Sequence, residues 1–216
     1  VFTQIELLAS FDGALNIETG DLDGDGDADI MAAAREGGRI NWFRNNGGGS
    51  FTSNTIVNNF ANPREVKLRD YDQDGDLDVI YVAEAGSGWF SNTNGNFTIN
   101  AYTTSSNAFS VDVADIDGDG LLDFIRAFPQ TPSISWSRNT GNQVLSGGGT
   151  IDNGLTSPSL VVPGDFNADG RVDVMCGSDF DVRLAINATG QVFSSVVLNR
   201  YATNNHGACH GDFDND

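Results

Sequence analysis

The chain has 216 residues, of which 39% are hydrophobic and 19% charged, and it contains 26 glycines. This length suffices for one domain of good size, no stretch of about 20 apolar residues predicts a membrane span, and the composition favours short strands joined by turns over long helices. The formal net charge is -19, and the absence of a basic patch with interleaved aromatic residues argues against a nucleic-acid partner.

The negative charge is concentrated in short clusters. Twenty of the 30 acidic residues lie within residues 21–29, 70–78, 115–123, 165–173 and 212–216. Outside these clusters 10 acidic residues face 10 basic ones, so the rest of the surface is about neutral. A general polyanionic role is therefore disfavoured.

The clusters recur at a regular period. They begin at Asp21, Asp70, Asp115, Asp165 and Asp212, at spacings of 49, 45, 50 and 47 residues. A period of this length indicates a tandem repeat of one supersecondary unit. In chain order we predict a fourth strand of a preceding repeat at 1–14, followed by repeats at 15–62, 63–108, 109–158 and 159–203, and a partial repeat at 204–216.

Each repeat has room for four strands. An alternating segment precedes the acidic cluster, as at 110–115, and an apolar run follows it, as at 77–85. Asn/Gly turns, which favour hairpins, then close the predicted third strands at 39–49, 87–95, 133–141 and 182–190. The fourth strands open near Phe51, Phe97, Val144 and Phe193.

Four strands in about 48 residues, repeated in tandem, match a blade of a β-propeller. We therefore predict an all-β protein, a single β-propeller domain over residues 1–216 with about 4.5 four-stranded antiparallel blades. A β-sandwich gives no reason for the acidic loop to return at the same point. Because the fifth cluster stops before its turn glycine and last aspartate, we expect a longer parent chain or head-to-tail self-assembly.

The acidic loops have the pattern of calcium sites. Calcium takes six to eight oxygen ligands, and carboxylates at alternate positions of a tight loop point several oxygens at one centre. We assign side-chain ligands to loop positions one, three, five and nine, a backbone carbonyl to position seven, and the sharp turn to the glycine at position six. The assigned residues are Asp21, Asp23, Asp25, Asp27 and Asp29; Asp70, Asp72, Asp74, Asp76 and Asp78; Asp115, Asp117, Asp119, Leu121 and Asp123; Asp165, Asn167, Asp169, Arg171 and Asp173; and the incomplete set Asp212, Asp214 and Asp216.

A plain turn, an EF-hand and a magnesium site each fit these loops less well. Asp and Gly favour turns, but four crowded carboxylates without a cation repel by roughly 1 kcal/mol per pair in a water-like dielectric. An EF-hand needs a Glu at position twelve and flanking helices, whereas this chain has Ala32, Tyr81, Arg126 or Cys176 there. Magnesium rarely uses an all-protein cage. The neutral Asn167 predicts somewhat weaker binding by the fourth loop.

The blade pattern, DxDxDGDxD followed by an apolar strand, a WF or WS strand ending in Asn-x-Gly and a Phe, resembles the FG-GAP/VCBS repeats over the whole chain. This resemblance implies an integrin-α-like propeller with calcium held between the first and second strands of each blade. Such repeats also occur in secreted bacterial adhesins, some fungal lectins and non-catalytic parts of polysaccharide-degrading enzymes. The literal FG…GAP peptides are absent, which makes the VCBS-like branch the better match.

Three tryptophans recur at one place in the third strand, Trp42, Trp89 and Trp136, with Leu184 in the fourth repeat. Aromatic rings can stack on sugars, but the replacement by leucine favours packing between blades. We therefore expect these rings to be buried.

His206, Cys209 and His210 lie close together and raise the possibilities of a zinc site or a thiol nucleophile. The cluster occurs once and lacks a further ligand or a base with its orienting group. A disulfide between Cys176, which follows the fourth acidic cluster, and Cys209, which precedes the fifth on the neighbouring inner strand, fits the pattern better.

Asn96 and Asn187 begin N-glycosylation sequons beside the turn from the third to the fourth strand. We expect a glycan to be exposed at both. A chain this rich in Asn and Thr also carries one or two sequons by chance.

These patterns predict a calcium-binding extracellular scaffold for adhesion or assembly, secreted or on the cell surface, with a protein or glycan ligand and no catalytic role. A lectin that holds sugar in pockets between blades stays open, as does the non-catalytic propeller part of a secreted polysaccharide-active enzyme. An enzyme would need an unrepeated constellation of Lys, Arg, His or Tyr, which the sequence does not show.

Overall fold

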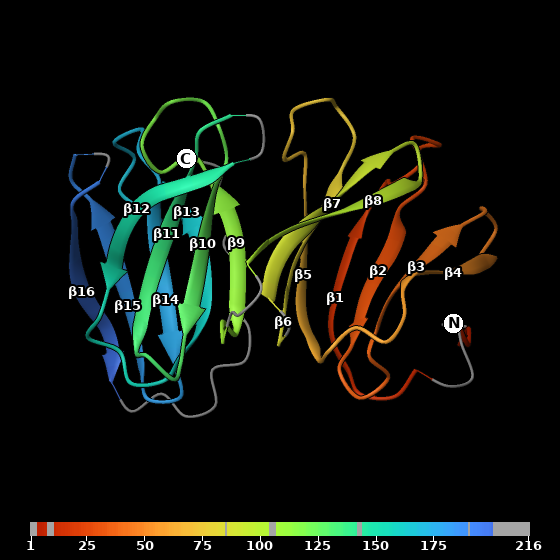
Figure 1. Ribbon diagram of the computed structural model, residues 1–216, viewed down its shortest axis with the longest axis horizontal. Coiled ribbons are helices and arrows are strands. Elements are labelled where there is room, and N and C mark those ends of the chain that lie inside the picture. Colours follow the sequence, from red (N-terminus) through yellow and green to blue (C-terminus); the bar gives the residue numbers. More distant parts are fainter. Residues whose placement is uncertain are drawn as a thin grey trace. The chain divides into compact units, whose positions relative to one another are not determined.

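The computed structural model describes residues 4–7, 11–84, 86–103, 107–141, 144–189 and 191–200. All regular structure within these ranges is β-strand, in four antiparallel sheets of four strands each (Figure 1). Each sheet follows the chain in order, from its first to its fourth strand. The sheets are the blades of a β-propeller, as the repeat pattern predicts.

The chain divides into two compact units, Val1–Ser106 and Asn107–Asp216. The first unit holds blade 1, with β1 (Ala14–Gly20), β2 (Asp29–Ala34), β3 (Arg39–Asn45) and β4 (Phe51–Val57), and blade 2, with β5 (Pro63–Arg69), β6 (Asp78–Ala83), β7 (Gly86–Thr93) and β8 (Asn96–Thr103).

The second unit holds blade 3, with β9 (Ser110–Ala114), β10 (Asp123–Phe128), β11 (Ser133–Asn139) and β12 (Leu145–Asp152), and blade 4, with β13 (Pro158–Gly164), β14 (Asp173–Ser178), β15 (Asp181–Asn187) and β16 (Phe193–Arg200). The predicted fourth strand at 1–14 falls partly outside the described residues, and residues 4–7 and 11–13 are not in a strand.

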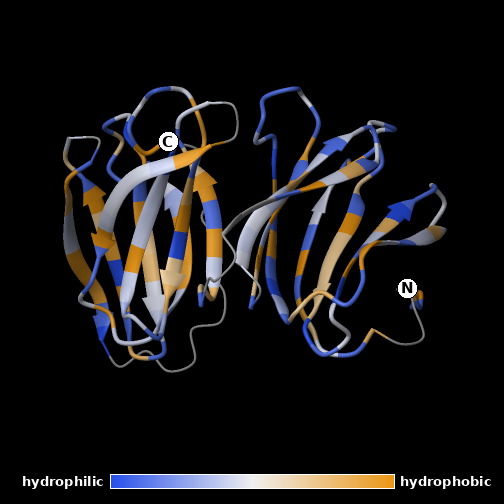
Figure 2. Cartoon of the chain, viewed as in Figure 1, coloured by the Kyte–Doolittle hydropathy of each residue, from blue (hydrophilic) through white to orange (hydrophobic). Residues whose placement is uncertain are grey.

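Burial falls from the middle of each blade to its outer edge. Every residue of β6 is buried, and β10 is buried except at its last residue, whereas most residues of β4 and β16 are exposed or half-buried. Hydrophobic and hydrophilic bands alternate along many of the strands (Figure 2). This pattern is expected for strands that pack against neighbouring sheets on their faces and meet solvent at an edge.

A hydrophobic core lies between the two blades of each unit. In the first unit it includes Met31, Ile40 and Trp42 of blade 1 with Val66 and Val79 of blade 2. The Trp42 ring meets Phe97 of blade 2 edge to face, with 5.6 Å between the ring centroids. The second unit repeats the arrangement with the residues Ile116, Ile125, Ile134, Trp136, Val161 and Val174.

The recurring tryptophans are core residues. Trp42, Trp89 and Trp136 expose 7%, 0% and 4% of their surface, which confirms the packing prediction and leaves no ring face free to stack on a sugar. The four acidic clusters within the described residues lie where they were expected, in the connections from the first to the second strand of each blade. We call residues 21–29, 70–78, 115–123 and 165–173 loops 1 to 4.

Candidate metal centre

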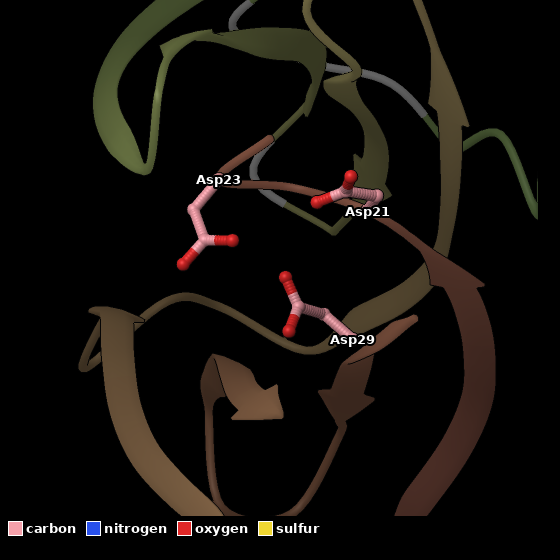
Figure 3. A group of neighbouring side chains, drawn as sticks. All are labelled: Asp21, Asp23 and Asp29. Carbon is pink, nitrogen blue, oxygen red and sulfur yellow. The ribbon is translucent and has the colours of Figure 1, made fainter. Parts of the chain in front are cut away.

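In three loops, carboxylate oxygens from positions one, three and nine converge. One oxygen from each residue of a group lies within 4.8 Å of the others. Figure 3 shows the three carboxylates of loop 1 facing a common space between them. The groups are Asp21, Asp23 and Asp29; Asp70, Asp72 and Asp78; and Asp115, Asp117 and Asp123.

The aspartate at position nine opens the second strand and is fully buried in every blade. In loop 2 the Oδ2 of Asp78 accepts a hydrogen bond from the Tyr71 amide at 2.9 Å, and its Oδ1 accepts one from the Asn92 amide at 2.8 Å. Asp29, Asp123 and Asp173 make the same two contacts with their own loop and third strand. This carboxylate therefore fixes both ends of the loop to the sheet.

The aspartate at position one closes the turn from the other side. Asp21 accepts hydrogen bonds from the amides of Gly24 and Gly26, each at 2.9 Å. The amide of the position-six glycine also reaches the first aspartate in loops 2, 3 and 4. That glycine has a φ between 83° and 99° in all four loops, which side chains strongly disfavour. The predicted role of glycine as the turn residue is confirmed.

The aspartate at position five is held differently. The Oδ1 of Asp25 accepts the amide of Asp27 at 3.0 Å, and the Oδ1 of Asp119 accepts the amide of Leu121 at 2.9 Å. The position-five residues are not in the converging groups. A ligand role for them, and for the position-seven carbonyls of Asp27, Asp76, Leu121 and Arg171, stays a prediction.

Two of these groups contain a buried oxygen without a donor, which a cation would satisfy. Oδ1 of Asp70 and Oδ1 of Asp117 are buried and have no hydrogen-bond partner within the described part of the chain. Burial raises the pKa of Asp78 to about 7 and that of Asp123 to about 6, and it also raises the pKa of Asp23 and Asp72. Desolvated carboxylates of this kind are relieved by a hard divalent cation. The three groups can hold a metal ion.

Loop 4 lacks a converging acidic group among its described residues. The Nδ2 of Asn167 donates to Asp169 Oδ2 at 3.0 Å, and the Arg171 guanidinium pairs with the same carboxylate. Hydrogen bonding by the Gly170 amide is the main cause that lowers the pKa of Asp165. Some of the polar side chains of loop 4 are thus already paired with one another by hydrogen bonds and an ion pair.

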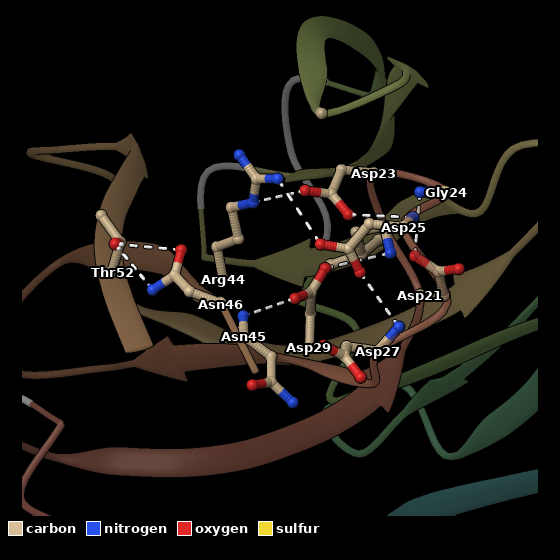
Figure 4. Close-up of polar contacts among 12 residues, drawn as sticks. Asp21, Asp23, Gly24, Asp25, Asp27, Asp29, Arg44, Asn45, Asn46 and Thr52 are labelled. Atoms are coloured by element: carbon tan, nitrogen blue, oxygen red, sulfur yellow. Dashed lines mark hydrogen bonds and ion pairs between the residues drawn. The ribbon is translucent and has the colours of Figure 1, made fainter. Parts of the chain in front are cut away.

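Two arginines to which the sequence pattern assigned no role form ion pairs with loops 1 and 3. Arg44 Nε lies 2.5 Å from Asp23 Oδ2, and Arg44 Nη2 lies 3.5 Å from Asp25 Oδ2 (Figure 4). In loop 3 Arg138 Nε lies 2.6 Å from Asp117 Oδ2, and its Nη2 lies 2.8 Å from Asp119 Oδ2. The sequence did offer a sign of these ion pairs: in the first and third repeats an arginine stands directly before the asparagine that ends the third strand.

That asparagine is a second feature that sequence reasoning missed. The Nδ2 of Asn45, Asn92, Asn139 and Asn187 donates to the carbonyl of the residue before the last aspartate of its loop. Asn92 also donates to the Leu22 carbonyl of loop 1 at 2.8 Å, and Asn187 to the Ile116 carbonyl of loop 3 at 3.0 Å. The asparagines therefore join each loop to its own blade and, in blades 2 and 4, to the preceding loop.

This role corrects one glycosylation prediction. Asn187 is fully buried and its amide nitrogen donates to two carbonyls, so the expectation of an exposed glycan there is wrong. Asn96 is exposed, with its Nδ2 2.9 Å from the Thr93 carbonyl, and its glycosylation stays a prediction.

Several other candidates lie outside the described residues, namely Asp212, Asp214, Asp216, His206, Cys209 and His210. Cys176 is buried in the core of the second unit, where burial raises the pKa of its thiol. Its pairing with Cys209 stays a prediction.

Comparisons with known proteins agree with the repeat and the fold. The FG-GAP-like repeat matches residues 21–81, 70–126 and 117–176. An Agrocybe aegerita lectin that recognises non-reducing terminal N-acetylglucosamine is similar with a TM-score of 0.60 and 20% identity, over 82% of this chain and 50% of the lectin. The chain thus spans about half the length of that lectin, and the likeness concerns the fold.

Two further structures show weaker likeness. The V. cholerae biofilm matrix protein Bap1 has a TM-score of 0.46 and 16% identity, over 85% of this chain and 30% of that protein. The Photorhabdus luminescens Tc holotoxin pore has a TM-score of 0.36 and 15% identity, over 91% of this chain and 12% of that protein. A comparison with curated protein sequences found no match.

Proposed function

The chain belongs to the FG-GAP-like repeat family, and on that premise we propose that it is a calcium-binding module of an extracellular scaffold for adhesion or assembly. One observation carries the calcium assignment: carboxylates from positions one, three and nine converge in register in three successive blades. A turn preference alone does not require this convergence, because it brings like charges together.

Calcium suits these groups better than other metals. The converging donors are all carboxylate oxygens, which select hard cations over zinc or copper. A loop that supplies several protein oxygens favours calcium over magnesium, which keeps most of its water ligands. Side chains at positions one, three and nine would hold the ion, with those at position five and the carbonyl at position seven as further proposed ligands.

The structure around each loop supports a stabilising role. Leu22, Tyr71 and Ile116 at position two of loops 1 to 3 are buried in the blades, and the position-nine aspartate ties the loop to the third strand. A bound cation neutralises the carboxylates that join the first and second strands. Calcium would therefore stabilise the blades themselves.

We include in the proposal a non-catalytic role, a secreted or cell-surface location and a protein or glycan partner. The converging carboxylates of the described residues all belong to repeated loops, which favours a structural use over chemistry at one cleft. Extracellular modules bind calcium with dissociation constants of about 0.1 to 1 mM, a range in which weak loop sites are filled outside the cell. The described residues form no helix of the length and apolar character that a membrane crossing requires.

Calcium removal tests the proposal. With about 1 mM free calcium and a dissociation constant near 0.1 mM, each site adds roughly 1.4 kcal/mol, and three sites add about 4 kcal/mol. We expect the melting temperature to fall by about 10 °C in chelator. Asp72→Ala should lower the number of bound calcium ions by one, whereas Asp179→Ala, outside the loops, should leave it unchanged. Equal melting temperatures with and without calcium would refute the role.

A lectin is the second candidate, because the Agrocybe aegerita lectin shares the fold. The buried Trp42, Trp89 and Trp136 are unsuited to stack on a sugar, so a sugar site would use other residues. Binding to glycans that end in N-acetylglucosamine, measured with calcium present, would support this candidate, and binding no tighter than to an unrelated glycan would reject it.

A further inference from the structure

We infer that Arg44 and Arg138 are tethered counter-ions that compete with calcium for loops 1 and 3, so that loop 2 is the tightest calcium site of the three. This inference rests on the proposed calcium function and concerns how the same sites are tuned. It assigns to the two arginines a role in setting the relative calcium affinities of loops 1 to 3.

The two guanidinium groups occupy the carboxylates that a metal ion would need. Arg44 Nε contacts Asp23 Oδ2, and Asp23 is a member of the converging group of loop 1. Arg138 Nε contacts Asp117 Oδ2, and Asp117 is the equivalent member in loop 3. In both loops the Nη2 atom reaches the position-five carboxylate. A calcium ion that uses positions three and five must therefore displace the guanidinium or bind beside it.

Loop 2 has no arginine at this place. The residue directly before the third-strand asparagine is Ser91 in blade 2. Among the described residues, no basic side chain forms an ion pair with Asp72 or Asp74. Oδ1 of Asp70 is buried without a donor. The carboxylates at positions three and five of loop 2 therefore carry their charge without a paired guanidinium.

The two arginine side chains are exposed enough to leave the carboxylates with which they pair. The side chains of Arg44 and Arg138 are 44% and 42% exposed, while Asp23 and Asp117 are 7% and 5% exposed. An ion pair with one exposed partner is weak and exchangeable, so the guanidinium can leave when calcium arrives. Breaking two such contacts should weaken calcium binding about three- to tenfold.

The same contacts have the opposite effect when calcium is absent. Each guanidinium offsets part of the repulsion among the carboxylates of its loop. Loops 1 and 3 should then keep their shape better than loop 2 in calcium-free protein. Removal of an arginine therefore has two opposed consequences: tighter calcium binding and a less stable calcium-free state. A purely structural residue would not tighten binding when it is removed.

Calorimetric titration with calcium, together with thermal melting in chelator, tests the inference on the full chain. We expect one tight and two weaker sites in the wild type among loops 1 to 3. Arg44→Ser should convert one weak calcium site into a tight one, with a three- to tenfold gain in calcium affinity. The same variant should have a lower melting temperature in chelator. Arg44→Lys, which keeps the charge, should retain the weak class. The reciprocal Ser91→Arg should remove the tight class.

Arg200→Ser is the matched control, because Arg200 is an exposed residue of β16 and its loss changes the net charge equally. Arg200→Ser should change neither the numbers of tight and weak calcium sites nor their affinities. If Arg44→Ser behaves like Arg200→Ser while calcium still binds, the competition is refuted and the proposed function stands. If no calcium binds to the wild type at all, both are overturned.

Discussion

Replacing Asn92 by alanine should destabilise the first unit more than the same replacement of Asn45. The two asparagines hold equivalent places at the ends of β7 and β3. Asn92 is fully buried, its Nδ2 donates to the Leu77 and Leu22 carbonyls, and its Oδ1 accepts the Gly95 amide. Asn45 has an exposed bond to Ala28 and a bond from Gly47, and lacks a second carbonyl partner among the described residues.

The magnitude follows from these contacts. Three hydrogen bonds at about 1 kcal/mol each give about 3 kcal/mol for Asn92→Ala, and the buried carbonyls left without a donor raise this toward about 4 kcal/mol. Asn45→Ala loses two bonds that are partly open to water, which gives about 1 kcal/mol. The bond from Asn92 to Leu22 joins residues 70 apart, so most of the difference reports on the contact between blade 2 and loop 1.

Urea denaturation in saturating calcium measures both variants. The expected difference in the free energy of unfolding is about 2 to 3 kcal/mol, with an unchanged slope against denaturant. Equal losses for the two variants, within about 0.5 kcal/mol, would refute the reasoning, because they would show that the bond to the preceding loop contributes nothing.

Three further predictions follow from the loops and the core. Burial raises the pKa of Asp78 to about 7 and that of Asp123 to about 6. Because a raised pKa means that the folded state holds the proton more tightly than the unfolded state, calcium-free protein should lose stability as pH rises from about 4 to about 7. Asp78→Asn should flatten this pH dependence, measured by denaturation at several pH values. Gly75→Ala should cost about 1 kcal/mol in thermal unfolding, because φ is 99° there while the added methyl group meets no atom within 4 Å; a neutral result would contradict the strain. Thiol titration of unreduced, denatured protein should find no reactive thiol if Cys176 pairs with Cys209, and two reactive thiols would exclude the bridge.

The sequence by itself determined the blade order and the place of each acidic loop. The interactions that shape a loop are local: Asp21 binds the amides of Gly24 and Gly26, three and five residues away. A pattern of Asp and Gly therefore specifies the turn wherever it occurs, and its period specifies the repeat. The strands β3, β7, β11 and β15 begin within one residue of their expected starts.

Only the tertiary structure decided which polar residues surround the loops. Asn187 and Asn96 both begin sequons, but Asn187 is buried and its amide donates to the Ile116 carbonyl, 71 residues away in the chain. Arg44 meets Asp25 across 19 residues because β3 pairs with β2 beside the loop. Such contacts depend on how a strand returns to its loop and how one blade packs on the next. The local sequence is the same whether a side chain is exposed to solvent or forms a buried hydrogen bond. The roles of these residues could therefore be recognised only from the tertiary structure.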